Sequence, residues 1–487
     1  MTIKTYKIYL INIYVFILGI ITSFSLPPFN YWIINFFTFT LLFVLLFKNK
    51  NQNKNFFFIN GYIFGFGYFV SSLYWIPLSL LYDDNFKYLV PFALILIPAF
   101  LSFFYGAAFL SFSFFLKFKS VFINILIFSV VLGFFEFMRG KILSGFPWNL
   151  FAYSFSETIN FIQINSLIGV YAFNTKIITL FCIPSILFLN KSKNDLIGFF
   201  IIIFICISTY LYGIYKINNF NNLKVEKLPL EIKIISSNIP IERFYNNVDE
   251  QDIIKELINL SNPNQNHESI FIWPEGVIPN ANFKILKNEY GYLFRNSFSK
   301  NHQIILGIND EESNSEKLKI YNSLVVIDNE VNILYNYKKN KLVPFGEFLP
   351  LENILSKMGL KTLTNNYLSY TASSERKLFN LYKKSSIKIL PLICYEIIYS
   401  GEISKDKDYN FIVNISEDGW FGDSIGPHQH FAHSIFRSIE YGKYTLRSAN
   451  NGISAIVDPT GFIVDKLEVN NKGVISTNEI VNTNKTL

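Results

Sequence analysis

The uneven distribution of apolar residues constrains the fold of this chain more than any other feature of its sequence. The first 220 or so residues are rich in Phe, Ile, Leu and Tyr and carry few charges. From about Asn221 onward the composition is the mixed one of a soluble globular domain. A chain of 487 residues has room for two or three domains. We therefore expect a membrane domain over residues 1–220 and a water-facing α/β domain over residues 221–487, with its core at about 231–467.

The membrane half contains apolar stretches of about the length, roughly 20 residues, that a helix needs to cross a bilayer. They lie near residues 8–24, 31–47, 56–77, 88–116, 121–138, 160–189 and 195–215. This pattern predicts about seven transmembrane helices. We expect the first to be a retained span, since no convincing cleavage site follows it, and we expect no further span in the polar C-terminal tail.

Lysines on the connections between these stretches predict the orientation of the chain. They fall on alternate connections, at Lys4 and Lys7, Lys48, Lys50 and Lys54, Lys117 and Lys119, and Lys191 and Lys193. By the positive-inside rule those connections are cytoplasmic, and an odd number of spans then makes the second half exoplasmic. The alternative is a chance alternation in a lysine-rich sequence.

Charge and cysteine usage narrow the possible partners. The net charge is +7, but lysine is scattered and no nucleic-acid-binding motif is present, so an anionic membrane surface is the expected partner and nucleic acid is not. Cys182 and Cys206 lie in apolar runs, and Cys394 is the one cysteine of the polar half, so we expect no structural disulfide. Glu136 and Arg139, three residues apart, are expected to pair, either as a structural ion pair or as part of a lipid head-group site.

Short β-like runs alternate with amphipathic stretches in the second half, which predicts a layered α/β domain. The expected strands are residues 232–236, 269–273, 303–308, 322–328, 386–393 and 410–416, and the expected helices are 249–260, 282–298 and 427–443. Three polar segments follow strand-like runs: Trp273-Pro274-Glu275-Gly276, the stretch from Lys338 to Phe348, and Cys394-Tyr395-Glu396. Strand ends at the rim of a sheet are the usual place for catalytic groups.

A thiol at such a strand end is well placed to attack an ester. Because a free thiol has a pKa of about 8.5, it needs a base to take its proton or a cation to favour the thiolate. We predict Cys394 as the nucleophile, Glu275 as the general base and Lys339 as the cation that holds the oxyanion. The alternative for Cys394 taken alone is a small buried apolar residue.

These motifs resemble those of a known family. WPEG, YKKNKLVPFGEFLP and ICYE resemble the Glu, Lys and Cys motifs of the carbon-nitrogen hydrolase, or nitrilase, superfamily. LVPFGE, NISEDGWFGDSIGPHQH and RSANNGISAIVDPTG resemble the bacterial apolipoprotein N-acyltransferase family in particular. The resemblance extends to the membrane half, in the stretches at 26–32, 61–76 and 135–149.

The resemblance implies a multi-pass α-helical membrane domain that carries a nitrilase-like αββα sandwich on the periplasmic side of the bacterial inner membrane. It implies the triad Glu275, Lys339 and Cys394, without a cofactor. The cysteine would take an acyl chain as a thioester from the sn-1 position of a phospholipid, with phosphatidylethanolamine the expected donor. The chain would then pass to the α-amino group of the diacylglyceryl-cysteine that begins an apolipoprotein.

The resemblance also implies supporting residues. Glu347 would support the intermediate beside Lys339, and Tyr395 and Glu396 would shape the acyl site. The family usually has a tryptophan at the pocket mouth where this chain has Tyr245, so we expect the tyrosine to replace it. His428 and His430, with no third ligand nearby in the sequence, make a poor metal site, and we expect no metal.

Two other functions fit parts of the sequence. The first is a membrane-tethered amidase or nitrilase that uses the same triad on a small exoplasmic amide. The second is a transporter or receptor with an extracellular ligand-binding domain, in which Cys394 would be dispensable. Acyl transfer to a lipopeptide would exclude the first, and a requirement for Cys394 would exclude the second.

Overall fold

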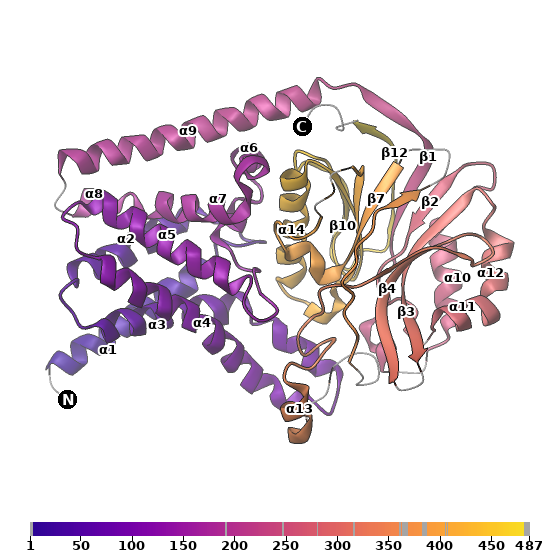
Figure 1. The fold of residues 1–487 in the computed structure, drawn as a ribbon, viewed down its shortest axis with the longest axis horizontal. Coiled ribbons are helices and arrows are strands. Elements are labelled where there is room, and N and C mark those ends of the chain that lie inside the picture. The colour runs from indigo at the N-terminus through magenta and orange to yellow at the C-terminus, as the bar shows by residue number, and fades with distance from the viewer. Residues whose placement is uncertain are drawn as a thin grey trace. The chain divides into compact units, whose positions relative to one another are not determined.

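The chain divides into two compact units, one helical and one α/β (Figure 1). The computed structural model describes residues 3–189, 192–245, 248–279, 281–314, 317–359, 362, 369–381, 387–404, 406 and 408–481. The helical unit comprises residues 1–81, 86–218 and 424–432, and the α/β unit comprises residues 82–85, 219–423 and 433–487.

The helical unit is built from long apolar helices. They are α1 (Ile3–Ser23), α2 (Ile33–Lys48), α3 (Lys54–Ser72), α4 (Val90–Phe115), α5 (Val121–Arg139), α6 (Ile159–Ile162), α7 (Asn165–Cys182), α8 (Ser185–Phe188) and α9 (Lys193–Asn221). Among the described residues, four helical segments are long and apolar enough to cross a membrane, and a bent pair, Lys54–Ser72 with Ile76–Tyr82, makes up to five. The apolar helices Ile8–Ser23 and Ile33–Lys48 are shorter. The count of seven spans stays a prediction.

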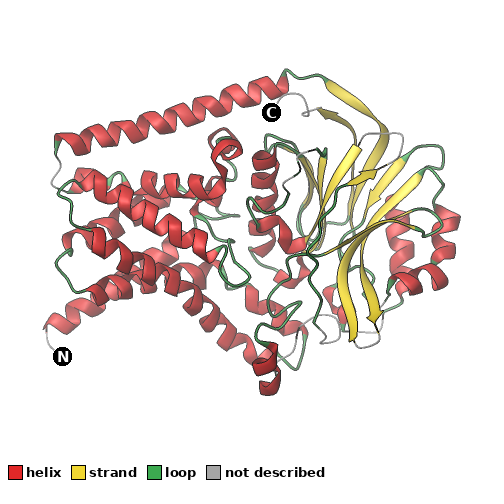
Figure 2. Cartoon of the chain, in the orientation of Figure 1, coloured by secondary structure: helices red, strands yellow, loops and turns green. Residues whose placement is uncertain are grey.

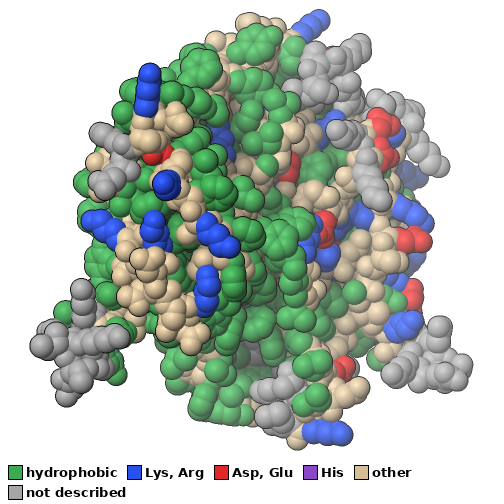
Figure 3. Space-filling model, turned by 60° about the vertical axis from the view of Figure 1, so that its left-hand side comes forward, with side chains coloured by type: hydrophobic (Ala, Val, Ile, Leu, Met, Phe, Trp, Pro, Cys, Tyr) green, Lys and Arg blue, Asp and Glu red, His purple; other side chains and the backbone are tan. Residues whose placement is uncertain are grey.

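The outer surface of the helical unit is strongly hydrophobic, as a lipid-facing surface would be. Figure 3 shows hydrophobic side chains over much of one face of the molecule. On α9 the exposed side chains include Phe200, Phe204 and Leu211, which are 65%, 70% and 57% exposed. Such broad apolar exposure is unusual for a protein surface in contact with water alone.

One ion pair is buried inside the helical unit at the end of α5. Arg139 donates from Nε to Glu136 Oε2 at 3.0 Å and makes a second, shorter contact from Nη2. The Tyr105 hydroxyl donates to the same carboxylate, and Arg139 Nη1 donates to the Phe146 carbonyl. Both charged side chains are fully buried. These contacts favour the structural interpretation of the pair over a role in binding a head group.

The α/β unit contains two six-stranded sheets. The first has the order β12-β1-β2-β3-β4-β5 and the second the order β11-β10-β9-β8-β7-β6. The strands of the first sheet are β1 (Val225–Ser236), β2 (Ser269–Ile272), β3 (His302–Asn314), β4 (Lys317–Ile327), β5 (Ile333–Lys338) and β12 (Gly473–Val481). Those of the second are β6 (Phe379–Leu381), β7 (Ile387–Ile393), β8 (Phe411–Glu417), β9 (Tyr444–Asn450), β10 (Ser454–Val457) and β11 (Ile463–Leu467).

Parallel strands occupy the middle of each sheet, so that Glu275 follows a parallel strand of the first sheet and Cys394 follows one of the second. β1, β2 and β3 are parallel, as are β7, β8 and β9. The side chains of β2, β8 and β9 are buried throughout and those of β7 at all positions but one, and burial on both faces explains the apolar runs of β2 and β7 in the sequence. The alternation of strands and helices is therefore as the sequence predicts.

Helices α10 (Glu250–Ser261), α11 (Phe283–Glu289) and α12 (Gly291–Ser297) lie beside the first sheet within this unit (Figure 2). The short α13 (Glu352–Leu355) and the second half of α14 (Gly426–Tyr441) also belong to it, whereas the first half of α14 belongs to the helical unit. The predicted helix over 282–298 is broken near Tyr290 into α11 and α12. Leu257, Leu286 and Phe294 from three of these helices pack with Phe271 and Trp273 in one hydrophobic core. This core fixes the position of the loop that follows β2.

Candidate active site

Glu275 lies in a tight loop directly after β2. Gly276 next to it has φ +61°, a conformation that favours glycine. A Cβ on Gly307 of β3 would lie 2.8 Å from the Cα of Glu275 and 3.1 Å from the Gly276 nitrogen, so the close approach of this loop to β3 requires glycine there. The Glu275 side chain is 10% exposed. Its Oε2 accepts a hydrogen bond from the Glu417 N–H at 3.1 Å.

Lys339 follows β5 and is buried between two carboxylates. Its Nζ lies 2.9 Å from Glu347 Oε1 and 3.3 Å from Glu275 Oε1. The Lys339 N–H donates to the Asn322 carbonyl at 2.9 Å, which fixes the backbone at this point. Burial by itself would lower the pKa of Lys339, but the charges of Glu275 and Glu347 raise it well above its usual value. The lysine is therefore a fixed cation.

Glu347 and Asn322 complete the set around the ammonium group. Glu347 Oε2 accepts from the Val343 N–H at 2.8 Å, so the loop of the LVPFGE motif folds back on its own carboxylate. Asn322 of β4 donates from Nδ2 to both Glu275 Oε1 and Glu347 Oε1, each at 2.7 Å. Sequence reasoning missed Asn322. Its position as the polar first residue of the predicted strand 322–328 was the signal that could have found it.

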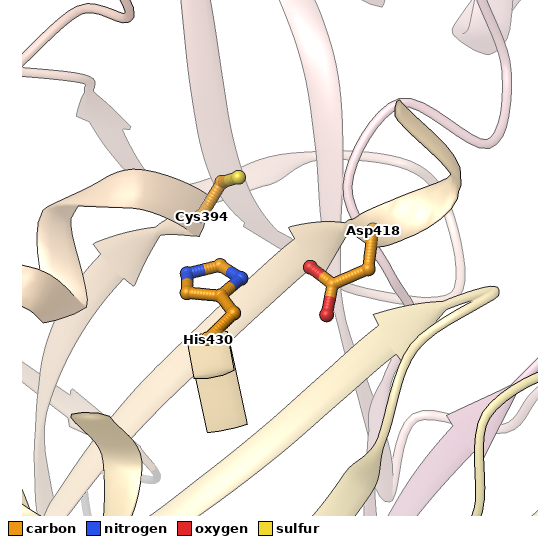
Figure 4. A group of neighbouring side chains, drawn as sticks. All are labelled: Cys394, Asp418 and His430. Carbon is orange, nitrogen blue, oxygen red and sulfur yellow. The ribbon is translucent and has the colours of Figure 1, made fainter. Parts of the chain in front are cut away.

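Cys394 stands at the end of β7 with a strained backbone. Its φ of +47° is in the left-handed region that non-glycine residues rarely adopt, and such strain concentrates at functional sites. The neighbouring parallel strand β8 leads to Asp418, and Figure 4 draws the side chains of Cys394 and Asp418. Asp418 is held by Arg447 at 2.7 Å. Asn414 of β8 donates to the Cys394 carbonyl at 3.4 Å.

The surroundings of the thiol oppose its spontaneous ionisation. Burial raises the pKa of Cys394 above its ordinary value, and the charge of Glu275 raises it further. The charge of Lys339 and a hydrogen bond with Ser416 act in the opposite direction. At neutral pH the resting residue is therefore a thiol rather than a thiolate, and its attack on a carbonyl requires a base. The structure thus brings the thiol, a carboxylate and an ammonium group into one electrostatic environment.

Tyr395 and Glu396 follow the cysteine and are both buried. Tyr395 packs edge-on against Tyr399, with ring centroids 5.4 Å apart. Glu396 accepts hydrogen bonds from the Ile393 and Asn340 N–H groups, each at 2.9 Å, and pairs with Arg376 at 2.7 Å. Its carboxylate therefore joins the cysteine turn to the segment that carries Lys339.

Tyr245 belongs to an aromatic cluster around Trp420. Its ring lies 6.4 Å from that of Trp420, and the rings of Phe244 and Tyr82 lie 5.2 and 6.3 Å from the same indole. Tyr245 is half-buried, and its predicted place at a pocket mouth is not tested by these contacts. His428 and His430 lie in α14, and the expectation of no metal stays a prediction.

Comparison with known proteins agrees with this architecture. Residues 264–480 match the family model of carbon-nitrogen hydrolases, and residues 18–183 match that of the apolipoprotein N-acyltransferase N-terminal domain. An amidase from Nesterenkonia sp. is among the similar solved structures, at 12% identity and a TM-score of 0.35 over 53% of this chain and 93% of that one. A likeness of that size adds nothing to the assignment.

The fold and the family match together define an enzyme of the carbon-nitrogen hydrolase class joined to a helical domain. Apolipoprotein N-acyltransferase from Rickettsia prowazekii is 33% identical over 93% of this chain and 89% of its own length. The protein of that name from Rhodopseudomonas palustris is 31% identical over 94% and 87%. The chain belongs to the apolipoprotein N-acyltransferase family, which is membrane-bound and whose role is the N-acylation of lipoproteins. The resemblance, the fold class and the enzyme class expected from the sequence are confirmed.

Proposed function

We propose that this chain transfers an acyl chain from the sn-1 position of a phospholipid to the α-amino group of the diacylglyceryl-cysteine that begins an apolipoprotein. Phosphatidylethanolamine is the proposed donor. One observation carries the proposal for the chemistry: a buried ammonium, Lys339, is held between Glu275 and Glu347 in the electrostatic environment of the Cys394 thiol. Membership of the family supports the substrate class.

In the first half-reaction Glu275 takes the proton of Cys394, and Sγ attacks the ester carbonyl of the donor. The resulting oxyanion is stabilised by Lys339, whose raised pKa keeps it charged throughout. When the intermediate collapses, the carbon–oxygen bond of the ester breaks and Glu275 returns the proton to the leaving alkoxide. The products are a lysophospholipid and a thioester on Cys394.

In the second half-reaction the neutral amine of the acceptor attacks the thioester carbonyl, and Glu275 takes a proton from the attacking nitrogen. Lys339 stabilises the second oxyanion in the same way. The carbon–sulfur bond then breaks, and the proton on Glu275 returns to the cysteine sulfur. An amide is formed and the thiol is regenerated, so the cycle needs no cofactor.

The supporting residues hold Glu275, Lys339 and Cys394 in position. Glu347 and Asn322 hold Lys339 and Glu275 at a fixed spacing, as their hydrogen bonds of 2.7–2.9 Å suggest. Tyr395 and Glu396 shape the site next to the nucleophile, Glu396 by holding the cysteine turn to the lysine segment. Tyr245, beside Trp420, borders the mouth of the acyl pocket.

The same proposal includes a location and a domain plan. Residues 1–220 form the membrane domain with about seven spans, and residues 221–487 form the catalytic domain. Lysines on alternate connections support a catalytic domain on the periplasmic side of the bacterial inner membrane. A lipid donor explains why a hydrolase-like site is joined to apolar helices, since a soluble amide substrate would require none.

Mass spectrometry of the intact protein after incubation with phosphatidylethanolamine vesicles tests the proposal. We expect a mass gain of one acyl chain that hydroxylamine removes, and its transfer to a diacylglyceryl peptide added afterwards. Cys394→Ala should lack the gain, while a Cys182→Ala/Cys206→Ala variant, which keeps only Cys394, should retain it. A folded protein that hydrolyses small amides but takes no acyl chain would instead support the tethered amidase.

A further inference from the structure

Arg243 is a fully buried guanidinium that the reaction sequence above does not use. It follows the NIP stretch, in the segment where this chain departs from the family pattern around Tyr245. Only 1% of its side chain is exposed. Burying a guanidinium is costly unless its donors are all engaged, so its contacts indicate what it does.

The contacts of Arg243 converge on the loop that carries Glu275. Nε and Nη2 donate to the Gly276 carbonyl at 3.1 and 2.9 Å, a forked contact with the residue directly after Glu275. Nη1 donates to the Pro240 carbonyl at 2.9 Å and the Ile239 carbonyl at 3.2 Å. Nη2 also pairs with Glu417. One side chain therefore ties the segment after β1, the loop after β2 and the end of β8 together.

Glu417 holds the other side of the same carboxylate. Its backbone N–H donates to Glu275 Oε2 at 3.1 Å. Its side chain accepts from the Gly419 N–H and from Asn450 Nδ2, both at 2.8 Å, so the residue is itself fixed. The Glu275 loop is thus held at its backbone by Arg243 and at its carboxylate by Glu417.

We propose that Arg243 and Glu417 are positioning residues for the general base: Arg243 holds the backbone of its loop through the Gly276 carbonyl, and the Glu417 N–H holds its carboxylate. This inference rests on the proposed function, because it assumes that Glu275 acts as the base. It deepens that function by naming the residues that fix where the base lies.

The other groups that act on Glu275 stay unchanged in the test. They are Lys339 and Glu347 from the segment after β5, Cys394 after β7 and Tyr370. Burial raises the pKa of the Glu417 carboxyl, while the guanidinium of Arg243 lowers it. Removing the Glu417 charge therefore leaves the guanidinium uncompensated, whereas removing Arg243 lets burial raise the pKa of Glu417 further, toward the neutral acid.

The effect on the pH dependence differs between the two partners. Glu417→Gln leaves the positive charge of Arg243 beside the Glu275 loop, which favours carboxylate over carboxylic acid and should move the acid limb of the pH–rate profile for acylation to lower pH by about one unit. Arg243→Met lets Glu417 take up a proton, so it should lower the rate about 100-fold without moving the acid limb. Arg243→Met/Glu417→Gln should bring the limb back toward that of the unchanged protein, although the rate stays about 100-fold lower because the loop is no longer held.

The test measures the rate of Cys394 acylation by phosphatidylethanolamine vesicles from acid to alkaline pH, by intact mass, in the full-length protein. Arg243→Lys is included because it keeps the charge without the planar fork, and should lower the rate without moving the limb. Arg437→Met is the matched control: Arg437 is also buried and pairs with Glu440 at 3.0 Å, and its loss should not move the acid limb.

The possible results separate the two proposals. No acylation of the unchanged protein would contradict the proposed function. A lowered acylation rate in both variants, with a downward pH shift in Glu417→Gln only, supports the positioning role. An unchanged rate in Arg243→Met, or equal shifts in the two variants, would overturn it. Should Arg243→Met not fold, Glu417→Gln and Arg243→Lys still decide: the first must shift the limb downward and the second must not shift it.

Discussion

The helical unit and the α/β unit each bury a cation against glutamate, but the two clusters differ in their balance of charge. At the end of α5 one guanidinium, Arg139, meets one carboxylate, Glu136. In the α/β unit one ammonium, Lys339, meets two carboxylates and acts on a thiol as well. The pair of Arg139 and Glu136 carries no net charge. The unbalanced set keeps one carboxylate more than its cation neutralises, and that surplus can take a proton.

The largest expected difference comes from removing the charges of each cluster. Lys339→Met should lower the rate of Cys394 acylation by about 1000-fold, because the oxyanion loses its cation, and Lys339→Met/Glu347→Gln should not restore it. Glu136→Gln/Arg139→Met should keep the rate per folded molecule within about tenfold, since removing both partners leaves no uncompensated charge. Intact mass after incubation with phospholipid vesicles measures both. If the two double variants lost the same amount of acylation rate at equal folded fractions, the two clusters would not differ in function as we predict.

A glycine in each unit extends the comparison to packing. Gly307→Ala would push on the backbone of Glu275 and should lower the acylation rate about 100-fold while the protein stays folded. Gly67→Ala in α3 would bring a Cβ within 2.3 Å of the Phe16 carbonyl oxygen, so it should reduce the yield of folded protein but not the rate per molecule. Yield in detergent and acylation rate distinguish the two. A Gly307→Ala protein with full activity would show that the position of the base is not critical.

The charge surplus also predicts how the thiol titrates. Because the Glu275 charge raises the pKa of Cys394, Glu275→Gln should lower that pKa, and the rise in alkylation rate with pH should move to lower pH by about one unit. The measurement uses iodoacetamide in a Cys182→Ala/Cys206→Ala background, with Glu256→Gln at the surface as the control. A shift to higher pH would contradict the electrostatic account.

The smallest expected effect concerns the backbone at the nucleophile. At φ +47° glycine carries no penalty from a Cβ, whereas alanine does. Cys394→Gly should therefore be as stable as Cys394→Ala or more stable by up to about 1 kcal/mol, although both are inactive. At an ordinary strand position the order would be reversed. The melting temperatures of the two variants, measured in the same detergent, test this prediction.

The sequence predicted those parts of the fold that depend on local patterns. The strands β1, β2, β3, β4, β7 and β8 were predicted from apolar runs, and the α10 and α14 helices from amphipathic stretches, because burial selects apolar residues. The fully buried β9 was not predicted, because Thr445, Arg447 and Ser448 interrupt its apolar pattern, and neither were β5, β11 and β12. The short edge strand β6 was not predicted, since three residues with one buried side chain carry too little pattern. The break between α11 and α12 was missed for a similar reason.

For the site, sequence motifs placed Glu275, Lys339, Glu347 and Cys394, and the structure brings them into one environment. Asn322, Arg243 and Glu417 were missed because the side-chain contacts that join Asn322 to Glu347 and Glu275, and Arg243 to Glu417, connect residues 25 to 174 positions apart in the chain. No local pattern records such a contact. The positive φ of Cys394 was equally hidden, because a cysteine at a turn looks the same in sequence whatever its backbone angle.

The shared carboxylate of Glu396 has a consequence for motion. Because it accepts hydrogen bonds from Ile393 in the cysteine turn and from Asn340 and Lys341 beside Lys339, neither segment can open without breaking bonds of the other. The amide hydrogens of both segments should then exchange with deuterium at one common rate, as a single cooperative opening unit. The nucleophile and its cation would be exposed to solvent together or not at all.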